Sequence, residues 1–434
     1  MDRRKFLKIS AVSAAALPVL PEALASSGVK IPKLLKGDHV KEPAREIPVV
    51  ASYDLLVAGG GPSGVAAAIC AAREGASVLL VERYAFLGGL WTGGLVLPVL
   101  STHGLDSAGG WTKCVSGFMD ELCGRLFDMG MCVNKLDPTV DPEAAKYVME
   151  QMIQEAGVEM LYNATVAHVA MSGDRIDAAI LETKSGRIAV RAKAFVDASG
   201  DGDLIAYCGE SFDTMKYHIG AMWRVGGLDP AFRKVGTRTP IPGVRVMHLH
   251  GEDDKDGLDA FENTRIWIRQ RKLMWERTQD LKKMEGAENS FLLETPPQIG
   301  VRVTRMLDAV KRLSLEETMT GAVHADVIGM SGGSDSDSNY YKGRKIKKKE
   351  RPIWQIPYSS LVPKKVQNLI VAGRCFGFER ELAWDAREIG TCFVTGQAAG
   401  VAAALAIKER AGVRDVDIAK LQATLRRQGA MLEL

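Results

Sequence analysis

Apolar residues gather in short runs in the first third of the chain, and glycine-rich turns separate these runs. Residues 53–58 (Y-D-L-L-V-A) are typical of a strand that is buried on both faces. The strand ends in the turn G-G-G-P-S-G at 59–64, and the helical pattern that follows ends at Gly75. A second apolar run at 77–81 ends at Glu82. The pattern predicts a strand–turn–helix–strand unit, which is the opening of an α/β fold.

A change of periodicity follows this unit. A helical pattern from Asp141 leads into a short apolar strand at 158–161. Three alternating runs with turn residues between them come next, at 165–171, 176–183 and 188–192. Alternation with turns at that spacing predicts a small antiparallel β-meander inserted into the α/β domain.

Apolar strands return after the meander. A separate buried strand is expected at 194–197, before the turn A-S-G-D-G-D. Near the end of the chain, another apolar run at 368–372 predicts a strand, and a long helix is expected from about Gly390. Residues 416–427 predict a small amphipathic helix that closes the domain.

The middle of the chain differs in composition from the segments on either side. It is richer in tryptophan and arginine, and an amphipathic helix is expected from Asp259 to Met284. We therefore predict a second, α+β domain here that covers a substrate site. The expected division is a leader at 1–25, a linker at 26–50, the nucleotide-binding domain at 51–210, the substrate or lid domain at 211–350 and a return segment at 351–434.

The leader has the features of a twin-arginine export signal. Arg3 and Arg4 head a basic stretch, an alanine-rich apolar segment follows, and residues 23–25 (A-L-A) suit a signal peptidase. An uncleaved anchor is the alternative, but two prolines and a glutamate interrupt an apolar run shorter than the roughly 20 residues needed to span a membrane. We expect a periplasmic or secreted protein without stable membrane insertion.

Overall composition narrows the classes of partner. Apolar residues make up 46% of the 434 residues and charged residues 25%, as in a folded globular protein. The 56 Lys and Arg against 53 Asp and Glu give a formal net charge of +3. Nucleic-acid binding, which depends on neutralising phosphates, is therefore not expected.

Cysteines and histidines give no strong sign of a metal site. The seven cysteines include no C-x-x-C pair, which argues against zinc ribbons and cysteine-ligated clusters. One disulfide among Cys114, Cys123 and Cys132 is an open alternative after export. His248 and His250 share a predicted strand face but have no third ligand at a fixed spacing, so no metal site is predicted.

The glycine-rich turn has the spacing of a dinucleotide-binding motif. Gly59, Gly61 and Gly64 satisfy G-x-G-x-x-G between a buried strand and a helix, and Glu82 ends the next strand. Gly59 permits the tight turn, Gly61 lets the backbone approach a pyrophosphate, and Gly64 permits close helix packing. The helix N-terminus offers N–H groups to the phosphates, and Glu82 is suited to accept the ribose hydroxyls.

Four separated segments then carry a resemblance to a known family. They are D-L-L-V-A-G-G-G-P-S-G, V-E-R-Y-A-F-L-G-G-L-W-T-G-G, A-K-A-F-V-D-A-S-G-D-G-D-L, and the stretch from I-P-Y-S-S-L-V-P through N-L-I-V-A-G-R-C to G-T-C-F-V-T-G-Q-A-A-G. The chain resembles the FAD-dependent oxidoreductases of the glutathione-reductase-like superfamily, in the branch related to the flavin subunit of heterodisulfide reductase. It lacks the cluster-binding cysteine runs of that subunit. The resemblance implies a Rossmann-like FAD-binding domain with FAD as cofactor.

The resemblance also implies which residues contact the cofactor. The first segment would hold the pyrophosphate, Glu82 the adenosine ribose, and Val166 the adenine through its backbone. The remaining residues implied to bind the cofactor are Pro62, Ser63, Arg83, Gly88, Gly89, Thr92, Ser199, Gly200, Asp201, Arg374 and Gly390.

The residues expected to act on the substrate are His103, Arg305 and Arg387. Arg302 and Arg305 match a family stretch that faces the flavin pocket, and either guanidinium is suited to hold a carboxylate; a structural salt bridge is the alternative. Arg387 precedes the long C-terminal helix, whose N-terminal dipole near Thr391 would stabilise reduced flavin. His103 follows a glycine-rich segment and is the candidate base.

Three functions fit these features. The first is an exported FAD-dependent oxidoreductase that dehydrogenates or reduces a small organic substrate by hydride transfer to or from the flavin, with an electron acceptor or donor that the sequence does not identify. The second is a periplasmic C=C reductase supplied with electrons by a cytochrome or quinol. The third is a non-catalytic flavin-binding module.

Overall fold

The computed structural model describes residues 39–434 except 135, 334–339 and 348–349. The predicted signal peptide at 1–25 and residues 26–38 of the predicted linker lie outside the described residues. Residues 39–48 carry no helix or strand, and the first strand begins at Val49.

A seven-stranded mixed sheet forms the centre of the nucleotide-binding region. Its order is β7-β2-β1-β10-β9-β8, and β22 pairs with the end of β10. Pairing is parallel between β7, β2, β1, β10 and β22, and antiparallel in the β10-β9-β8 part. The strands are β1 (Val49–Ala58), β2 (Val78–Val81), β7 (Glu159–Leu161), β8 (Thr165–Ser172), β9 (Arg175–Thr183), β10 (Gly186–Asp197) and β22 (Leu369–Val371).

The sequence pattern predicted a meander separate from the parallel sheet. In the structure, the two are parts of one sheet. The strands expected at 188–192 and 194–197 are one continuous strand, β10. One edge of β10 pairs antiparallel with β9 over Gly186–Arg191, and its other edge pairs parallel with β1 as far as Asp197. The first half alternates because one face is exposed, whereas residues 194–197 are buried. That change of burial made one strand resemble two.

Two helices cross the sheet in close contact. α2 (Pro62–Arg73) begins in the glycine-rich turn, and α10 (Ile389–Glu409) lies against it. A Cβ added at Gly396 would lie 2.2 Å from the carbonyl oxygen of Ser63, and one at Gly400 would lie 2.1 Å from that of Ala67. The small residues of α10 therefore let the two backbones approach each other. Among the described residues, α10 is the one helix long and apolar enough to cross a membrane, but 94% of its most apolar window is buried inside the protein.

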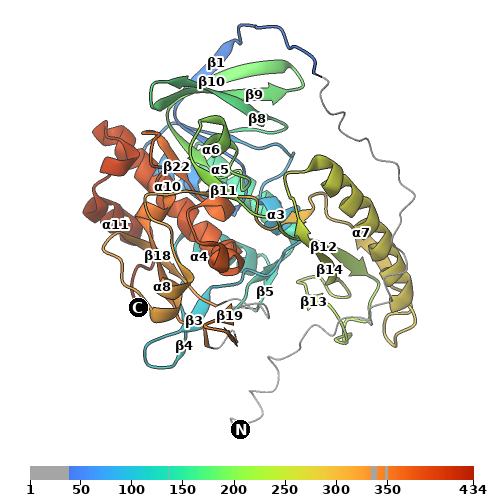
Figure 1. Cartoon of the computed structure of the whole chain (residues 1–434). Coiled ribbons are helices and arrows are strands. Elements are labelled where there is room, and N and C mark those ends of the chain that lie inside the picture. The colour runs from blue at the N-terminus through green and yellow to red at the C-terminus, as the bar shows by residue number, and fades with distance from the viewer. Residues whose placement is uncertain (1–38, 135, 334–339, 348–349) are drawn as a thin grey trace.

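A second region holds its own sheet and core. Its five antiparallel strands are β12 (Tyr217–Gly226), β13 (Thr237–Arg238), β14 (Arg245–Lys255), β15 (Phe291–Glu294) and β16 (Gly300–Val301). The predicted long helix is α7 (Ala260–Leu281), and the Asp259 side chain caps it by accepting from the N–H groups of Phe261 and Glu262. α7 packs on this sheet around Trp223 and Met274, on the right of Figure 1. The two regions together confirm the predicted fold class, a Rossmann-like α/β domain with an α+β domain beside it.

A buried ion-pair network joins the two regions. Arg224 of β12 reaches Asp141 at 3.0 Å and Glu294 of β15 at 2.6 Å. Asp141 also caps α5 (Pro142–Glu155) by accepting from two backbone N–H groups. Because Arg224 and Asp141 are both buried, the loss of either partner would leave an uncompensated charge inside the protein.

Shorter elements connect these layers. The remaining helices and strands are α3 (Gly89–Thr92), β3 (His103–Leu105), β4 (Trp111–Lys113), α4 (Phe118–Asp128), β5 (Cys132–Val133), β6 (Thr139–Val140), α6 (Asp203–Tyr207), β11 (Phe212–Thr214), β17 (Arg305–Leu307), α8 (Leu315–Thr320), β18 (Val327–Ser331), β19 (Tyr340–Tyr341), β20 (Arg344–Lys345), β21 (Trp354–Pro357), α9 (Ala383–Ala386) and α11 (Ile418–Arg427).

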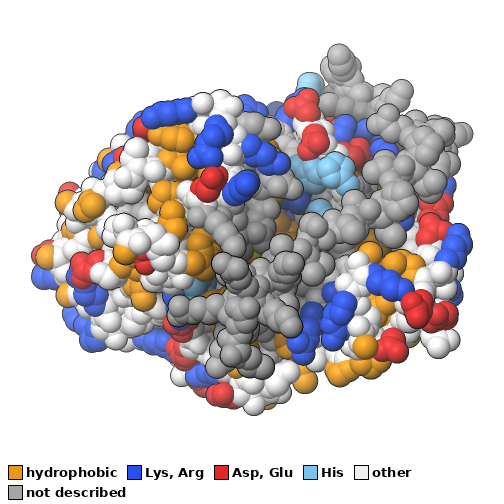
Figure 2. Space-filling view, turned by 90° about the horizontal axis from the view of Figure 1, so that it is seen from below, with side chains coloured by type: hydrophobic (Ala, Val, Ile, Leu, Met, Phe, Trp, Pro, Cys, Tyr) orange, Lys and Arg blue, Asp and Glu red, His pale blue; other side chains and the backbone are white. Residues whose placement is uncertain are grey.

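Cysteines and surface charge complete the description. All seven cysteines lie in the described part of the chain and are free thiols, so the possible disulfide among Cys114, Cys123 and Cys132 is not formed. Burial raises the pKa of Cys114 to about 12, as expected for an inert core thiol. On the face in Figure 2, the described basic and acidic side chains are interspersed rather than collected into one basic surface.

Candidate functional site

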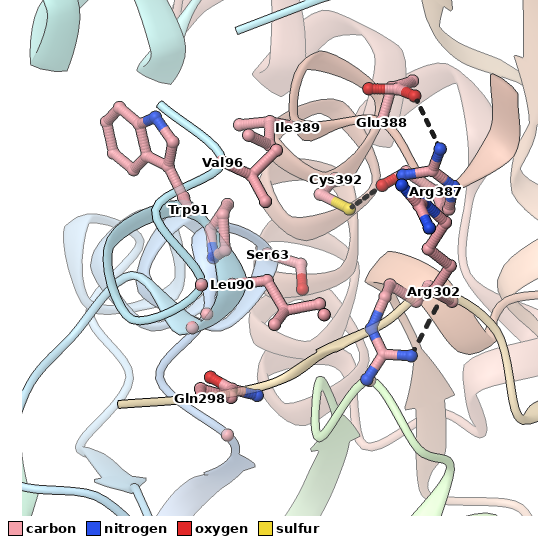
Figure 3. Close-up of a pocket in the computed structure, with 18 of the residues that line it drawn as sticks. Ser63, Leu90, Trp91, Val96, Gln298, Arg302, Arg387, Glu388, Ile389 and Cys392 are labelled. Atoms are coloured by element: carbon pink, nitrogen blue, oxygen red, sulfur yellow. Dashed lines mark hydrogen bonds and ion pairs between the residues drawn. The ribbon is translucent and has the colours of Figure 1, made fainter. Parts of the chain in front are cut away.

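A deep cleft is lined by residues from both sheets and from the N-terminal ends of α2 and α10. It contains about 1430 Å³ of empty space, including its open mouth. One end is formed by the turn at 59–63 and by residues 82–84. The other end is formed by residues 220–222, Arg302, Trp384 and residues 387–389, and Figure 3 shows part of it. We call these the nucleotide end and the substrate end.

The turn before α2 supplies the backbone of the nucleotide end. Gly59 has φ +99°, which favours glycine, and a Cβ added there would lie 2.5 Å from the carbonyl oxygen of Ala198. A Cβ at Gly64 would lie 1.8 Å from the carbonyl oxygen of Gly59. Gly61 is the N-cap of α2, Pro62 follows it, and no side chain caps the helix. Gly59, Gly61, Pro62 and Ser63 line the cleft, whereas Gly64 acts behind it through packing.

A second glycine turn lies against the first. Gly88 has φ +100° and precedes α3, and a Cβ added at Gly89 would lie 3.1 Å from the Cα of Gly61. Gly89 lines the cleft. Gly88 and Thr92 are not among its lining residues: Thr92 is buried and its hydroxyl donates to the carbonyl of Leu87. Gly88 and Thr92 therefore support the conformation of this turn from the side away from the cleft.

Glu82 places a buried carboxylate at the nucleotide end. Its Oε2 accepts from the N–H of Gly60 at 2.7 Å, and its Oε1 accepts from the N–H of Tyr84 at 2.9 Å. Burial raises the pKa of Glu82, while these two backbone donors act in the opposite direction. Val166, which was expected near the adenine, lies in the apolar core beside β9 and is not among the residues that line the cleft.

Two arginines that line the cleft share one carboxylate. Arg374 and Arg83 line the cleft, with Ser199 and Gly200 beside them. Asp201, behind them, accepts from Arg374 at 2.9 Å and lies 3.6 Å from Arg83. Burial by itself would raise the pKa of Asp201, but these two cations lower it below its usual value. Asp201 therefore orients the two arginines rather than facing the cleft.

The N-terminus of α10 also reaches the cleft. Glu388 is its N-cap residue, and Glu388, Ile389 and Cys392 line the cleft. Gly390 does not line it: a Cβ there would lie 2.7 Å from the carbonyl oxygen of Leu100, so this glycine permits a close approach to a neighbouring loop. Thr391 is buried, and its hydroxyl lies 2.8 Å from that of Ser331.

The substrate end gathers positive charge around an indole ring. The guanidinium carbon of Arg387 lies 4.8 Å from the centre of the Trp384 ring, and that of Arg302 lies 5.6 Å from it. Arg387 pairs with Glu388 at 3.2 Å. Burial and the neighbouring Arg387 lower the pKa of Arg302 to about 9, so this arginine is still a cation at neutral pH. Figure 3 shows both arginines on the side of the cleft opposite Leu90.

Two residues expected to be catalytic lie elsewhere. Arg305 donates to the backbone oxygen of Asp201 at 2.8 Å and pairs with Asp203 at 3.3 Å, and it does not line the cleft. Arg302 lies between β16 and β17, and a bend at Thr304 separates it from Arg305 at the start of β17. His103 is in the short β3–β4 hairpin, with its Nδ1 2.8 Å from the Thr102 hydroxyl, and also does not line the cleft.

The histidine that does reach the cleft is His248. It lies on β14 opposite Met222 of β12, and both residues line the cleft. Burial and the neighbouring His250 lower the pKa of His248. His250 shares its strand face, as predicted, and packs against His218, whose Nδ1 is 2.6 Å from Asp253. Within the described residues, no group of three or more metal-ligating side chains is arranged to hold a metal ion.

Several lining residues were not selected from the sequence. Trp384 and Glu388 flank Arg387 in W-D-A-R-E-I-G, and that adjacency was a usable signal. No feature of the sequence pointed to Gln298. Its backbone N–H donates to the Gly93 carbonyl, and its buried Oε1, at the cleft wall, has no hydrogen-bond partner. Met222 resembles any apolar strand residue in the sequence.

The nucleotide end fits a dinucleotide. Two glycine turns form a cradle that side chains would fill, and the N-terminus of α2 offers N–H groups that no side chain caps. Glu82 supplies a buried carboxylate at the distance along the chain that suits a ribose. The cleft then continues past the N-terminus of α10, which leaves room for a ring system beyond the phosphates.

Comparisons with known proteins found relatives that match part of the chain. The chain is 26% identical over 214 residues to thiamine thiazole synthase of Methanococcus vannielii, covering 45% of this chain and 75% of that protein. It is 26% identical over 195 residues to NADH:fumarate oxidoreductase of Klebsiella pneumoniae, covering 34% of this chain but 20% of that protein. Among solved structures, p-nitrophenol 4-monooxygenase of Pseudomonas putida is similar with a TM-score of 0.46 and 14% identity, over 88% of this chain and 90% of that one.

The family is shown by a model that spans most of the chain. The model of the FAD dependent oxidoreductase family matches residues 54–239 and 231–425, which include both glycine turns, the middle region and α10. The chain therefore belongs to the FAD dependent oxidoreductase family: it is an enzyme, and FAD is its cofactor.

Proposed function

We propose that this protein is an exported oxidoreductase that dehydrogenates or reduces a small organic substrate by hydride transfer to or from FAD. The observation that carries the proposal is the continuity of the cleft. It runs from the phosphate-binding turns to a separate end with two arginines, so a second small molecule has a place beside the cofactor.

The residues of the nucleotide end would hold the cofactor. The uncapped N-terminus of α2 would face the phosphates, and the Glu82 carboxylate would face the adenosine ribose. Arg83 and Arg374, oriented by Asp201, add positive charge along the same wall. FAD, when bound, supplies the hydride chemistry, which no protein side chain can supply.

The substrate end would orient the second molecule. Leu90, Val96 and Ile389 give it an apolar wall, and the arginines lie on the opposite side. Charges in such a partly dry cleft act more strongly than in water, so a bound substrate is held in one orientation. His248 lines the cleft, and the lowering of its pKa favours the neutral imidazole, which is the form suited to accept a proton.

A spectroscopic screen tests the proposal. The purified protein is mixed anaerobically with small acids, alcohols, amines and sugars, and the visible flavin band is recorded. We expect one class of compound to bleach the band and a suitable acceptor to restore it over many cycles. Protein that contains reducible flavin but turns over no donor or acceptor would contradict the proposal.

Reduction of a carbon–carbon double bond is the second candidate. The cationic substrate end favours it, as does the partial similarity to NADH:fumarate oxidoreductase. Here a cytochrome or quinol would supply the electrons. Dithionite-reduced protein should then be reoxidised faster by an unsaturated acid than by its saturated analogue. Reoxidation by oxygen alone at catalytic rates would count against this candidate.

Export by the twin-arginine route rests on the sequence of residues 1–25. A fusion of the full chain to a reporter should reach the periplasm, and replacing Arg3 and Arg4 together with lysine should hold it in the cytoplasm. Unchanged export of the double variant would contradict this part of the proposal.

A further inference from the structure

We propose that the substrate carries a carboxylate, and that Arg302 and Arg387 hold it beside the Trp384 ring at the substrate end. This inference rests on the proposed function, because it names the class of molecule that the substrate end would take. Arg305, the other arginine of the same sequence segment, has no part in it.

The two arginines form one cationic site although 85 positions separate them in the chain. Both guanidinium groups lie over the same indole, at 4.8 Å and 5.6 Å from its centre. α9 carries Trp384 and ends just before Arg387, and Arg302 follows β16, which pairs with β12. Trp384 also packs against Tyr217 of β12, with ring centres 6.4 Å apart. The indole thus fixes where both cations lie.

The described carboxylates around this site do not match its positive charge. Glu388 pairs with Arg387, and within the described residues no ion pair joins Arg302 to a carboxylate. The hydrogen bond recorded for the Arg302 guanidinium is long, 3.5 Å to the backbone oxygen of His218. Arg387 Nε is buried and has no hydrogen-bond partner. Two cations therefore share one carboxylate, and donors are left over.

Such an arrangement is costly unless an anion completes it. A half-buried cation beside a like charge loses part of its hydration and gains repulsion, and the lowered pKa of Arg302 reflects both effects. A carboxylate would accept from the free donors and offset the extra positive charge. Its planar shape also matches planar guanidinium groups, which bind carboxylates through two parallel hydrogen bonds.

The surrounding cleft limits what the rest of the substrate is. The wall opposite the arginines is apolar, with Leu90, Val96 and Ile389. An anion with a hydrocarbon body therefore fits the substrate end better than a sugar or a free phosphate. Because the same cleft opens toward the FAD-binding turns, the carboxylate anchors one end of a molecule whose body lies toward the cofactor.

Binding can be measured without turnover. The purified holoprotein is titrated with acetate, succinate and benzoate, with the neutral amides of these acids, and with inorganic phosphate, while changes in the flavin absorption spectrum are recorded. We expect at least one carboxylate to give a saturable spectral change, and its amide to bind about tenfold more weakly or worse. Binding of none of the acids, or equal binding of acid and amide, would overturn the proposal. Tighter binding of phosphate would overturn the choice of a carboxylate.

The variants Arg302→Gln and Arg387→Gln test whether these two arginines bind the carboxylate. Each should weaken carboxylate binding about tenfold or more while leaving the FAD content of the protein close to that of the wild type. The matched control is Arg271→Gln: Arg271 also lies over an indole, 4.5 Å from the ring centre of Trp267, but on α7 outside the cleft. It should bind the carboxylate as the wild type does.

Two further outcomes separate this inference from the proposed function. If the glutamine variants lose FAD but the remaining holoprotein binds the carboxylate normally, the arginines serve the cofactor and the inference is wrong. If carboxylates bind through Arg302 and Arg387 but no compound is ever oxidised or reduced, the proposed function fails and the anion site remains.

Discussion

The two ends of the cleft differ in whether backbone or side-chain groups line them. The nucleotide end is mainly backbone: two glycine turns, the N-terminus of α2 and a carboxylate at the end of β2. The substrate end is mainly side chains, contributed by β12, β14, α9 and the segment after β16. Backbone turns depend on local residues, whereas the positions of Arg302 and Arg387 depend on packing between distant elements.

This difference predicts different responses to mutation. At the nucleotide end, an added side chain collides with backbone that cannot move, so cofactor binding and folding fail together. At the substrate end, the side chains face an open cleft, so a substitution changes what binds and leaves the fold intact. Variants of the two ends should therefore separate into loss of flavin and change of ligand.

The largest effect is expected from Gly64→Val. A Cβ at Gly64 would lie 1.8 Å from the carbonyl oxygen of Gly59, so the turn and the start of α2 must separate. We expect purified protein to retain less than about a tenth of the wild-type FAD, because the phosphate-binding N–H groups are displaced. Flavin released on denaturation, divided by protein concentration, measures this.

Gly124→Ala is the matched control for Gly64→Val. Gly124 is in α4, and a Cβ there meets nothing within 4 Å, so this variant should keep its flavin and be slightly more stable. A folded Gly64→Val protein with a full complement of FAD would show that the turn is not rigid, and the contrast between the two ends would fail.

Arg224→Ala tests whether the buried ion-pair network holds the two regions of the fold together. The substitution leaves Asp141 and Glu294 without their cation at the boundary of the two regions. We expect a loss of about 3–5 kcal/mol in the free energy of unfolding, because an uncompensated charge stays buried. Urea denaturation followed by circular dichroism gives the value.

An exposed pair provides the comparison for Arg224. Arg187 pairs with Glu182 at 2.6 Å on the surface of the meander, and Arg187→Ala should leave the free energy of unfolding close to that of the wild type. Similar losses for the two variants would mean that the boundary is not held by this network.

The smallest effect is expected at Asp203, in the layer beneath the nucleotide end. Burial, together with the nearby Asp197 and Asp201, raises the pKa of Asp203 to about 6. The folded state therefore keeps a proton that the unfolded state has released, so stability falls as the pH rises from about 4 to about 6 and is then level. Asp203→Asn should gain about 1–2 kcal/mol relative to the wild type at pH 8 and little at pH 4.

Asp203→Glu keeps a carboxylate at this position and serves as the control for the pH dependence. Thermal unfolding at pH 4, 6 and 8 compares the three proteins. A stability difference between Asp203→Asn and the wild type that is the same at all three pH values would contradict the raised pKa.

Much of the fold could be predicted from the sequence because it is set by neighbours along the chain. β1, the glycine turn, α2 and β2 follow from a contiguous pattern of apolar runs and glycines, and α7 follows from its period and its Asp259 cap. The close contact of α2 with α10 was also predictable, since a helix so rich in glycine and alanine can approach another backbone.

Other features were decided by pairing between distant strands. β10 reads as two strands because its first half has one buried face and its second half has two. Only the sheet shows that the same strand pairs with β9 on one edge and β1 on the other. Burial depends on how the layers of the protein pack. In the sequence alone, a change in the hydrophobic pattern within one strand therefore cannot be distinguished from the end of a strand.

The sequence by itself determined the nucleotide end, since glycine conformation, helix start and the position of Glu82 are local properties of the backbone. Tertiary structure alone decided the substrate end. It turned Arg302 toward the cleft and Arg305 away, left His103 in a hairpin outside the cleft lining, and brought His248 to the wall. Side-chain direction there depends on how two sheets and two helix ends pack, and no local pattern encodes that packing.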